Sequence, residues 1–161
     1  MASVSVGDRI PEATLTVMTA RGPARHSSRE ILGVGRTVLF AVPGAFTPTC
    51  SARHLPGFLE HADSLDEAGV NRIVCVAVND IYVMDAWARS MGVGDRILMA
   101  ADGNGEFTRA LGLELDATGF GMGLRCRRFA MILEDGIIRH LLVEPPGEFR
   151  VSSAEHVLSL L

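Results

Sequence analysis

One of the three cysteines in the sequence, Cys50, ends the segment PGAFTPTC (43–50), in which an apolar run passes into a turn. Thr47 is a good N-cap for a following helix, and Pro48 a good first residue, because the N–H that proline lacks has no partner there. Cys50 then falls in the first helical turn, where unbonded N–H groups carry partial positive charge and stabilise a thiolate. Thiols in such settings have pKa values of about 3.5 to 7.5, against about 8.5 for a free cysteine. The pattern predicts a nucleophilic thiol.

The neighbouring residues favour this interpretation over that of a small packing residue. Pro43 can wall one side of the thiol, and Gly44 allows the backbone or a ligand to approach closely. His54, four residues after Cys50, could act as a base, but a thiol with a lowered pKa needs none, so we expect His54 to be structural. Nothing nearby completes a zinc site with these two residues, and no metal is expected.

Composition bounds the class of protein. The 161 residues suffice for one domain, expected to span 1–161, and 48% of them are hydrophobic and 21% charged. The net charge of −4 and the lack of a basic stretch argue against a nucleic-acid partner, and no apolar run is long enough to cross a membrane. The scattered cysteines form no disulfide framework, no C-x-x-C occurs and no signal peptide is evident, which favours a reducing compartment, the cytoplasm.

Buried strands and helices alternate around the thiol. Pro56 is expected to kink the helix that follows the turn. Two later helices carry start signals, Asn79 or Asp80 for one and Ser152 with Glu155, at capping-box spacing, for the last. Strands are predicted at 13–18, 36–42, 72–78, 96–102, 127–133 and 137–143, and helices at 27–32, 48–69, 82–92, 105–113 and 152–161. This order predicts an α/β fold, a thioredoxin-like three-layer sandwich with a central mixed sheet.

Longer motifs carry a resemblance that covers nearly the whole chain. In order, they are PGAFTPTCS (43–51), HLPGF (54–58), VAVNDIYVMDAWA (76–88), LMAADGNGEFTRALGLELD (98–116), RRFAMILEDGII (127–138) and VEPPGEFRVSSA (143–154). Together they resemble the type II, or peroxiredoxin-five, branch of the peroxiredoxins. The resemblance implies a thioredoxin-fold thiol peroxidase that reduces hydrogen peroxide and alkyl hydroperoxides through a cysteine sulfenic acid, without a bound cofactor.

The resemblance also implies roles for single residues. Cys50 matches the peroxidatic cysteine, Thr47 the hydroxyl that orients peroxide and contacts the thiolate, and Pro43 the residue that shields the sulfur. Arg128 matches the active-site arginine, whose permanent charge can favour the thiolate and stabilise negative charge on the leaving oxygen. Without the resemblance, Arg128 would be interpreted as a strand-edge arginine. Alternation along the predicted strand places it opposite Arg127, which we interpret as structural.

The sulfenic acid on Cys50 must be reduced by a second thiol, which could be Cys75, Cys126 or an external thiol. Some members of the branch carry a resolving cysteine before the last helix, but this segment here reads EFRVSSAEH (148–156) and has none. Cys75 lies in a buried strand and would need local unfolding to reach Cys50. Cys126 shares the alternation of Arg128 along the predicted strand and could face the pocket. We favour an external thiol, glutathione with glutaredoxin or else thioredoxin.

Two other functions remain open. A thiol transferase would use Cys50 alone, but the absence of C-x-x-C counts against it, and Thr47 and Arg128 would have no clear role. A redox sensor or holdase would record oxidation at Cys50 without turnover. The expected partners are peroxides, glutaredoxin or thioredoxin, and a second copy of the chain, because members of the branch form homodimers. Phe46 and the loop at 119–123 are candidates for that contact.

Overall fold

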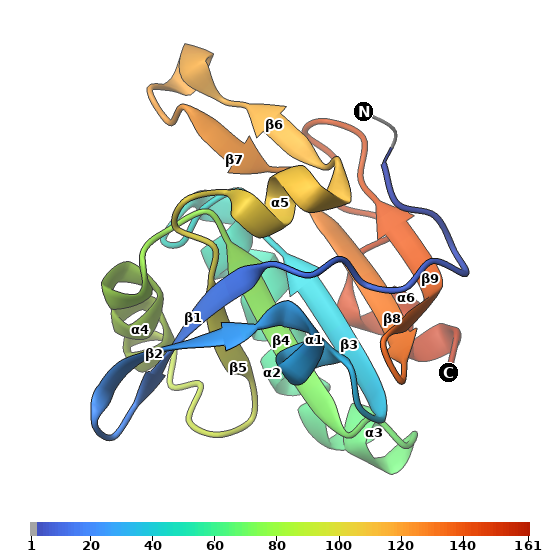
Figure 1. Ribbon diagram of the computed structural model, residues 1–161. Coiled ribbons are helices and arrows are strands. Elements are labelled where there is room, and N and C mark those ends of the chain that lie inside the picture. Colours follow the sequence, from blue (N-terminus) through green and yellow to red (C-terminus); the bar gives the residue numbers. More distant parts are fainter. Residues whose placement is uncertain (1–2) are drawn as a thin grey trace.

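The computed structural model describes residues 3–161, apart from the side chain of Cys50. A seven-stranded sheet with the order β2-β1-β5-β4-β3-β8-β9 forms the centre, and a separate two-stranded sheet pairs β6 with β7 (Figure 1). The strands are β1 (Thr14–Thr19), β2 (Gly22–Ser27), β3 (Arg36–Ala41), β4 (Arg72–Ala77), β5 (Leu98–Ala101), β6 (Glu114–Asp116), β7 (Leu124–Cys126), β8 (Phe129–Glu134) and β9 (Ile137–Val143). The β3–β4 and β4–β5 pairs are parallel and the other pairs are antiparallel, so the central sheet is mixed, as predicted.

Helices cover both faces of the central sheet (Figure 1). They are α1 (Ser28–Leu32), α2 (Leu55–Glu60), α3 (Ala62–Glu67), α4 (Ile81–Ser90), α5 (Glu106–Leu111) and α6 (Ala154–Ser159). Because side chains alternate along a strand, Val38 and Phe40 of β3 pack in the layer with α2, α3, α4 and α6, whereas Leu39 and Ala41 pack in the layer with α1 and α5. These layers make the predicted three-layer sandwich. No helix in the described part of the chain has the length and hydrophobicity to cross a bilayer.

The long helix predicted at 48–69 is present but interrupted. Its first residues pass at once into a π-helical segment, Cys50–His54, which leads into α2. Pro56 lies in the first turn of α2 and cannot donate to the carbonyl of Ala52, so the wider π turn falls where an α-helical hydrogen bond is missing. A second break, at His61, separates α2 from α3. The interruption expected at Pro56 is confirmed, and it sets the first turn apart from the packed remainder of the helix.

Two pairing elements are not indicated by the sequence. Strand β2 reads GPARHS, which has no apolar alternation, and it pairs only with β1 at the edge of the sheet, where the missing N–H of proline breaks no ladder. Strands β6 and β7 have three residues each, too few to leave a periodic pattern. They form a hairpin that projects beyond the main sheet (Figure 1).

Helix starts are predicted correctly for α4 and incorrectly for α6. The Asp80 carboxylate accepts the N–H of Val83 at 2.9 Å and caps α4. The last helix is capped by Ser153, whose hydroxyl oxygen accepts the N–H of His156 at 3.2 Å, and not by Ser152. The Ser152 side chain is directed instead toward Glu144, to which its hydroxyl donates at 2.7 Å.

Candidate active site

The turn between β3 and the π-helical segment is tied to its surroundings by side-chain hydrogen bonds. The N–H of Ala45 donates to Oδ1 of Asn79 at 2.9 Å, which joins the turn to the loop after β4. The Thr47 hydroxyl donates to the carbonyl of Gly44 at 2.7 Å. This bond fixes the direction of the hydroxyl hydrogen and leaves the oxygen able to accept another.

Two backbone positions in this turn are unusual. A Cβ on Gly44 would lie 3.1 Å from both Met122 Cε and Thr47 Cγ2 and 3.2 Å from Arg125 Nη1, so it is side chains, and not the backbone, that approach this glycine closely. Phe46 has φ of 63°, in the left-handed region that a bulky L residue rarely adopts. Backbone strain of this kind concentrates at functional sites.

Arg128 is joined to the π-helical segment by His54, the last residue of that segment. Nη1 of Arg128 lies 2.8 Å from Nδ1 of His54, and Nε2 of the same ring lies 2.9 Å from the carbonyl oxygen of Ser152. His54 is fully buried, and this desolvation, with the charge of Arg128 as the second cause, lowers its pKa to about 3. The imidazole is therefore neutral near pH 7, with Nε2–H donating to Ser152 and Nδ1 accepting from Arg128. Both ring nitrogens are engaged, so His54 is a structural residue, as predicted, and it orients Arg128.

The neutrality of His54 has an electrostatic consequence for Arg128. A carboxylate partner would cancel the charge of the guanidinium, whereas an imidazole accepts its hydrogen bond and leaves the charge in place. The ring of Phe149 lies against both groups, with its centroid 5.9 Å from Cζ of Arg128 and 5.0 Å from the His54 ring. The guanidinium is thus held in direction without being neutralised by His54.

Glu144 fixes the segment that presents Ser152 to His54. Its Oε2 accepts the N–H groups of Arg150, Val151 and Ser152 at 2.7, 2.8 and 2.8 Å, as well as the Ser152 hydroxyl. Burial by itself would raise the pKa of this carboxyl, but the hydrogen bonds outweigh burial and lower the pKa of Glu144. One carboxylate therefore orders the main chain at 150–152, which presents the Ser152 carbonyl to His54.

A pocket of about 220 Å³ adjoins the turn. We call it the arginine pocket, because Arg53, Arg127 and Arg128 line it, and Pro43 and Thr49 form its wall beside the helix start. The remaining lining residues are Leu115, Glu144, Pro145, Pro146, Gly147, Glu148 and Phe149. Of the predicted site residues, Pro43 and Arg128 thus come together at one cavity.

The structure corrects the alternation expected around Arg128. Strand β8 begins only at Phe129, and the two preceding residues connect it to β7 outside any strand. Alternation therefore does not separate Arg127 from Arg128, and both line the arginine pocket. For the same reason, placing Cys126 on the side of Arg128 by alternation is wrong. Cys126 ends β7, is 1% exposed, and donates its thiol to the carbonyl of Val42 at 3.1 Å.

Cys75 and Trp87 are fully buried in the layer that contains α2, α3, α4 and α6. Cys75 lies in β4 opposite Phe40 of β3, so the buried strand thiol expected there is confirmed. Trp87 of α4 donates its indole N–H to the hydroxyl of Ser51 at 2.9 Å. This bond ties α4 to the residue that follows Cys50.

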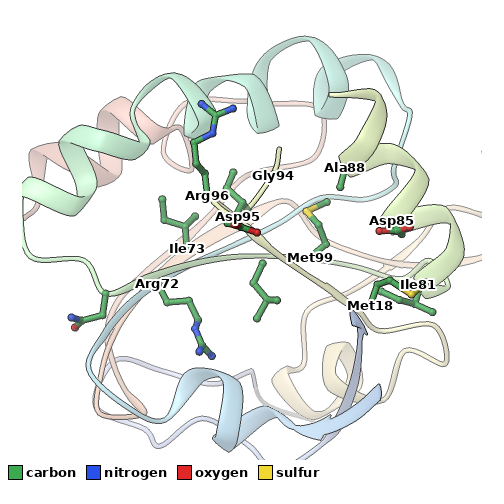
Figure 2. A pocket seen from close by; sticks show the side chains of 13 residues that line it. Met18, Arg72, Ile73, Ile81, Asp85, Ala88, Gly94, Asp95, Arg96 and Met99 are labelled. Atoms are coloured by element: carbon green, nitrogen blue, oxygen red, sulfur yellow. The ribbon is translucent and has the colours of Figure 1, made fainter. Parts of the chain in front are cut away.

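A larger pocket, of about 420 Å³, lies at the first residues of β4 and β5 beside α4, and we call it the amino-end pocket (Figure 2). Its arginines are bonded to main-chain carbonyls, Arg72 to Ile31 at 3.0 Å and Arg96 to Gly92 at 3.0 Å. Figure 2 shows their guanidinium groups directed away from each other. None of the predicted site residues lines this pocket.

Comparisons with known proteins show the family to which the chain belongs. A family model described as Redoxin matches residues 5–158. The chain is 49% identical over 166 residues to "Peroxiredoxin-2E-2, chloroplastic" of Oryza sativa subsp. japonica, covering 100% of this chain and 74% of that protein. It is 45% identical over 162 residues to "Peroxiredoxin-2B" of Arabidopsis thaliana, covering 100% of both.

Solved structures give the same result. Reduced Prx3 in complex with H2O2 from Vibrio vulnificus aligns with a TM-score of 0.94 and 48% identity over 98% of both chains. Peroxiredoxin 5 from Alvinella pompejana aligns with a TM-score of 0.85 and 35% identity over 97% of this chain and 96% of that one. The chain therefore belongs to the Redoxin family, with its thioredoxin-like fold. Within that family it is a peroxiredoxin, an oxidoreductase that works as a thiol-dependent peroxidase.

Sequence reasoning misses three residues that border the site. Arg53, Arg127 and Phe149 come from the π-helical segment, the β7–β8 connection and the segment after β9, and only the fold brings them together. The available signal is the arginine-rich stretch RCRR at 125–128, which surrounds the residue that the resemblance singles out.

Proposed function

We propose that the protein reduces hydrogen peroxide and alkyl hydroperoxides at Cys50, in the manner of the type II, or peroxiredoxin-five, branch. The Cys50 thiolate attacks one peroxide oxygen. A sulfur–oxygen bond forms, the O–O bond breaks, and the leaving oxygen takes up a proton and departs as water or an alcohol. The sulfur is left as a sulfenic acid, oxidised by two electrons, while the peroxide is reduced by two.

The observation that carries this proposal is the hydrogen bond between Arg128 and neutral His54. A guanidinium oriented in this way keeps its charge, both for the thiolate and for the negative charge that develops on the leaving oxygen. Thr47 would orient the peroxide, because its hydroxyl donates to Gly44 and can accept from a substrate O–H. Pro43, in the wall of the arginine pocket, would shield the sulfur.

Titration of the Cys50 thiolate by its ultraviolet absorbance tests the part of Arg128. We expect a raised thiol pKa in Arg128→Ala, and an unchanged pKa would remove the arginine from the resting site. Peroxide consumption with excess reductant tests the function itself. Repeated turnover separates a peroxidase from a redox sensor or holdase, which would be oxidised once at Cys50 and stop.

We propose that an external thiol resets the sulfenic acid, with reducing equivalents from glutathione and glutaredoxin or from thioredoxin. The thiol attacks the sulfenic sulfur, releases water and leaves a mixed disulfide, which a second thiol reduces. Cys75 and Cys126 are 0% and 1% exposed, so a disulfide from either to Cys50 would require local unfolding.

Intact mass distinguishes these routes. After one equivalent of peroxide and then glutathione, we expect a glutathione adduct on Cys50, and turnover should survive in the Cys75→Ala/Cys126→Ala double variant. Loss of turnover in that variant, together with an internal disulfide in the wild type, would show that the external route is wrong.

We propose that two copies of the chain pair through an aromatic face formed by Phe46, Tyr82 and Phe120. These side chains are 55%, 67% and 86% exposed. Their segments are held to one another by the Ala45–Asn79 bond and by a bond of 3.2 Å from Arg125 Nη1 to the carbonyl just before Asn79. Exposed aromatic side chains favour a protein interface.

Light scattering during size exclusion tests the pairing. Phe120→Asp should convert the dimer to a monomer, whereas Val34→Asp should not, although Val34 is an apolar residue with a similar exposure of 79%. A wild-type protein that elutes as a monomer would refute the proposal.

Three further properties are predicted from the sequence. We propose a single domain over 1–161, no bound cofactor, and a cytoplasmic location. Two relatives are chloroplastic by name, so cell fractionation is the decisive measurement for the location, and recovery of the protein from an organelle would overturn it.

A further inference from the structure

The arginine pocket holds more positive charge than a neutral peroxide requires. Arg128 is assigned to the thiolate, yet Arg53 and Arg127 line the same cavity. Nη2 of Arg127 donates to the carbonyl oxygen of Glu144 at 3.2 Å, and Cζ of Arg53 lies 4.7 Å from the ring centroid of Phe149. Neither a carbonyl nor an aromatic ring neutralises a guanidinium.

Neither carboxylate of the pocket forms an ion pair with Arg53 or Arg127, and Oε1 of Glu144 is buried without a hydrogen-bond partner in the described part of the chain. Oε2 of Glu144 takes its hydrogen bonds from the main chain at 150–152 and from the Ser152 hydroxyl. Oε1 of Glu148 lies 3.6 Å from Nη2 of Arg150. Among the ion pairs of residues 3–161, none involves Arg53 or Arg127. The pocket therefore presents two guanidinium groups without carboxylate partners.

The rest of the pocket wall is largely apolar. Leu115, Pro145, Pro146 and Phe149 supply apolar surface. The volume of about 220 Å³ equals that of about seven water molecules at about 30 Å³ each, which suits a small organic molecule and not a long chain. A guanidinium matches the two oxygens of a carboxylate with its planar pair of N–H donors. The pocket is thus complementary to a short carbon skeleton that ends in a carboxylate.

We propose that the arginine pocket binds the carboxylate of a small organic molecule that reacts at Cys50, and that Arg53 selects for it. The inference rests on the proposed function and names the chemistry of its substrates. Two reactants could carry the carboxylate, an organic hydroperoxide in the oxidative step or a small thiol in the reductive step. In both cases Arg53 and Arg127 receive the charge, and the apolar wall contacts the skeleton.

Matched acids and esters test this proposal in two arms. The oxidative arm compares kcat/KM for β-hydroperoxyisovalerate and its methyl ester. The reductive arm compares the rates at which β-mercaptopropionate and its methyl ester reduce the sulfenic acid on Cys50. We expect the acid to be preferred in at least one arm, which identifies the reactant. In that arm Arg53→Gln should lower the acid-to-ester ratio about fivefold, and Arg53→Lys should lower it less, because it keeps the charge without the fork.

Arg21→Gln is the matched control, because it removes the same charge from an exposed residue in the turn between β1 and β2, at the other end of the molecule from the β6–β7 hairpin (Figure 1). It should leave the ratio as in the wild type. An acid-to-ester ratio that is equal in wild type and Arg53→Gln in both arms would overturn the inference, and turnover of the ester would then leave the proposed function standing. No turnover with either acid or ester would overturn both.

Discussion

The arginine pocket and the amino-end pocket differ in what their arginines do. In the larger amino-end pocket, Arg72 and Arg96 donate to main-chain carbonyls at 3.0 Å and brace the surrounding loops. In the smaller arginine pocket, Arg128 is held by a neutral imidazole and Arg53 lies over an aromatic ring. The guanidinium groups of Arg72 and Arg96 thus hold main-chain segments in place, whereas those of Arg53 and Arg128 border the helix that begins near Cys50.

Cavity size is therefore a poor guide to the active site in this molecule. The pocket of about 420 Å³ adjoins no predicted site residue, whereas the pocket of about 220 Å³ adjoins the helix that begins near Cys50. What distinguishes the smaller pocket is that its positive groups border the helix that begins near Cys50 and that a neutral imidazole orients Arg128 there, a pattern typical of sites that stabilise anions.

The largest contrast is expected between Cys50 and Asp95. Cys50→Ser should stop peroxide reduction, because an alcohol at this position does not ionise near neutral pH. Asp95→Asn, in the amino-end pocket, should leave turnover as in the wild type. Peroxide consumption with excess thiol reductant measures both. Residual activity of Cys50→Ser above about one per cent, equivalent to about 2.7 kcal/mol, would contradict the assignment.

A second contrast pairs one arginine from each pocket. Arg128→Ala should slow peroxide reduction about a hundredfold, the order of effect seen when one donor to a developing negative charge is removed. Arg96→Ala removes an equal charge from the amino-end pocket and should change kcat/KM less than about twofold. Similar losses in both variants would mean that net charge, and not the oriented guanidinium, governs the rate.

The burial of His54 predicts a dependence of stability on pH. The unfolded chain binds a proton at His54 near pH 6.5, whereas the folded protein binds it only near pH 3. The free energy of unfolding should therefore fall as pH falls through 6, by up to about 1.4 kcal/mol per pH unit from this group. Because the pKa of Glu144 is lowered in the folded protein, the free energy of unfolding should fall further as the pH becomes more acid.

His54→Phe isolates this contribution. In this variant the free energy of unfolding, measured with urea at each pH, should fall less steeply between pH 6 and pH 4 than in the wild type. The pKa of the Cys50 thiol should rise, because Arg128 loses its orienting partner. A merely destabilised protein would show a shifted midpoint at every pH with the slope unchanged. An unaltered slope together with an unaltered thiol pKa would mean that His54 neither titrates on unfolding nor positions Arg128.

The smallest effect is expected from filling the amino-end pocket. Ala88 of α4 lines it and is partly buried, so Ala88→Leu should add apolar contact there without touching the arginine pocket. We expect kcat/KM to change less than about twofold and the free energy of unfolding to change by no more than about 1 kcal/mol. A severalfold change in kcat/KM would show that the two pockets are coupled through the sheet.

The central strands and the helix at Cys50 could be predicted because their signals are local. Runs such as RTVLFAV mark buried strands, and Thr47 with Pro48 marks a helix start. Strand β2 could not be predicted in this way, because an edge strand needs no apolar pattern. The cap predicted at Ser152 is wrong for a different reason, since its side chain is directed toward a carboxylate eight residues upstream, to which its hydroxyl donates.

The residues of the candidate site also fall into two groups, those that the sequence indicates and those that only the fold brings to the site. Cys50, Thr47, Pro43 and Arg128 are named by local sequence and by the resemblance to a family. Arg53 is not, because its significance depends on neighbours that are remote in the chain and that only the packed fold supplies.

The bond between Trp87 and Ser51 gives the molecule an internal optical probe. Trp87 is the sole tryptophan of the chain, is fully buried, and donates its indole N–H at 2.9 Å to the residue after Cys50. Its emission therefore reports on the first turn of the helix in real time. If oxidation of Cys50 loosens that turn, stopped-flow fluorescence should resolve oxidation and reduction as two phases of opposite amplitude, each dependent on the concentration of its own reactant.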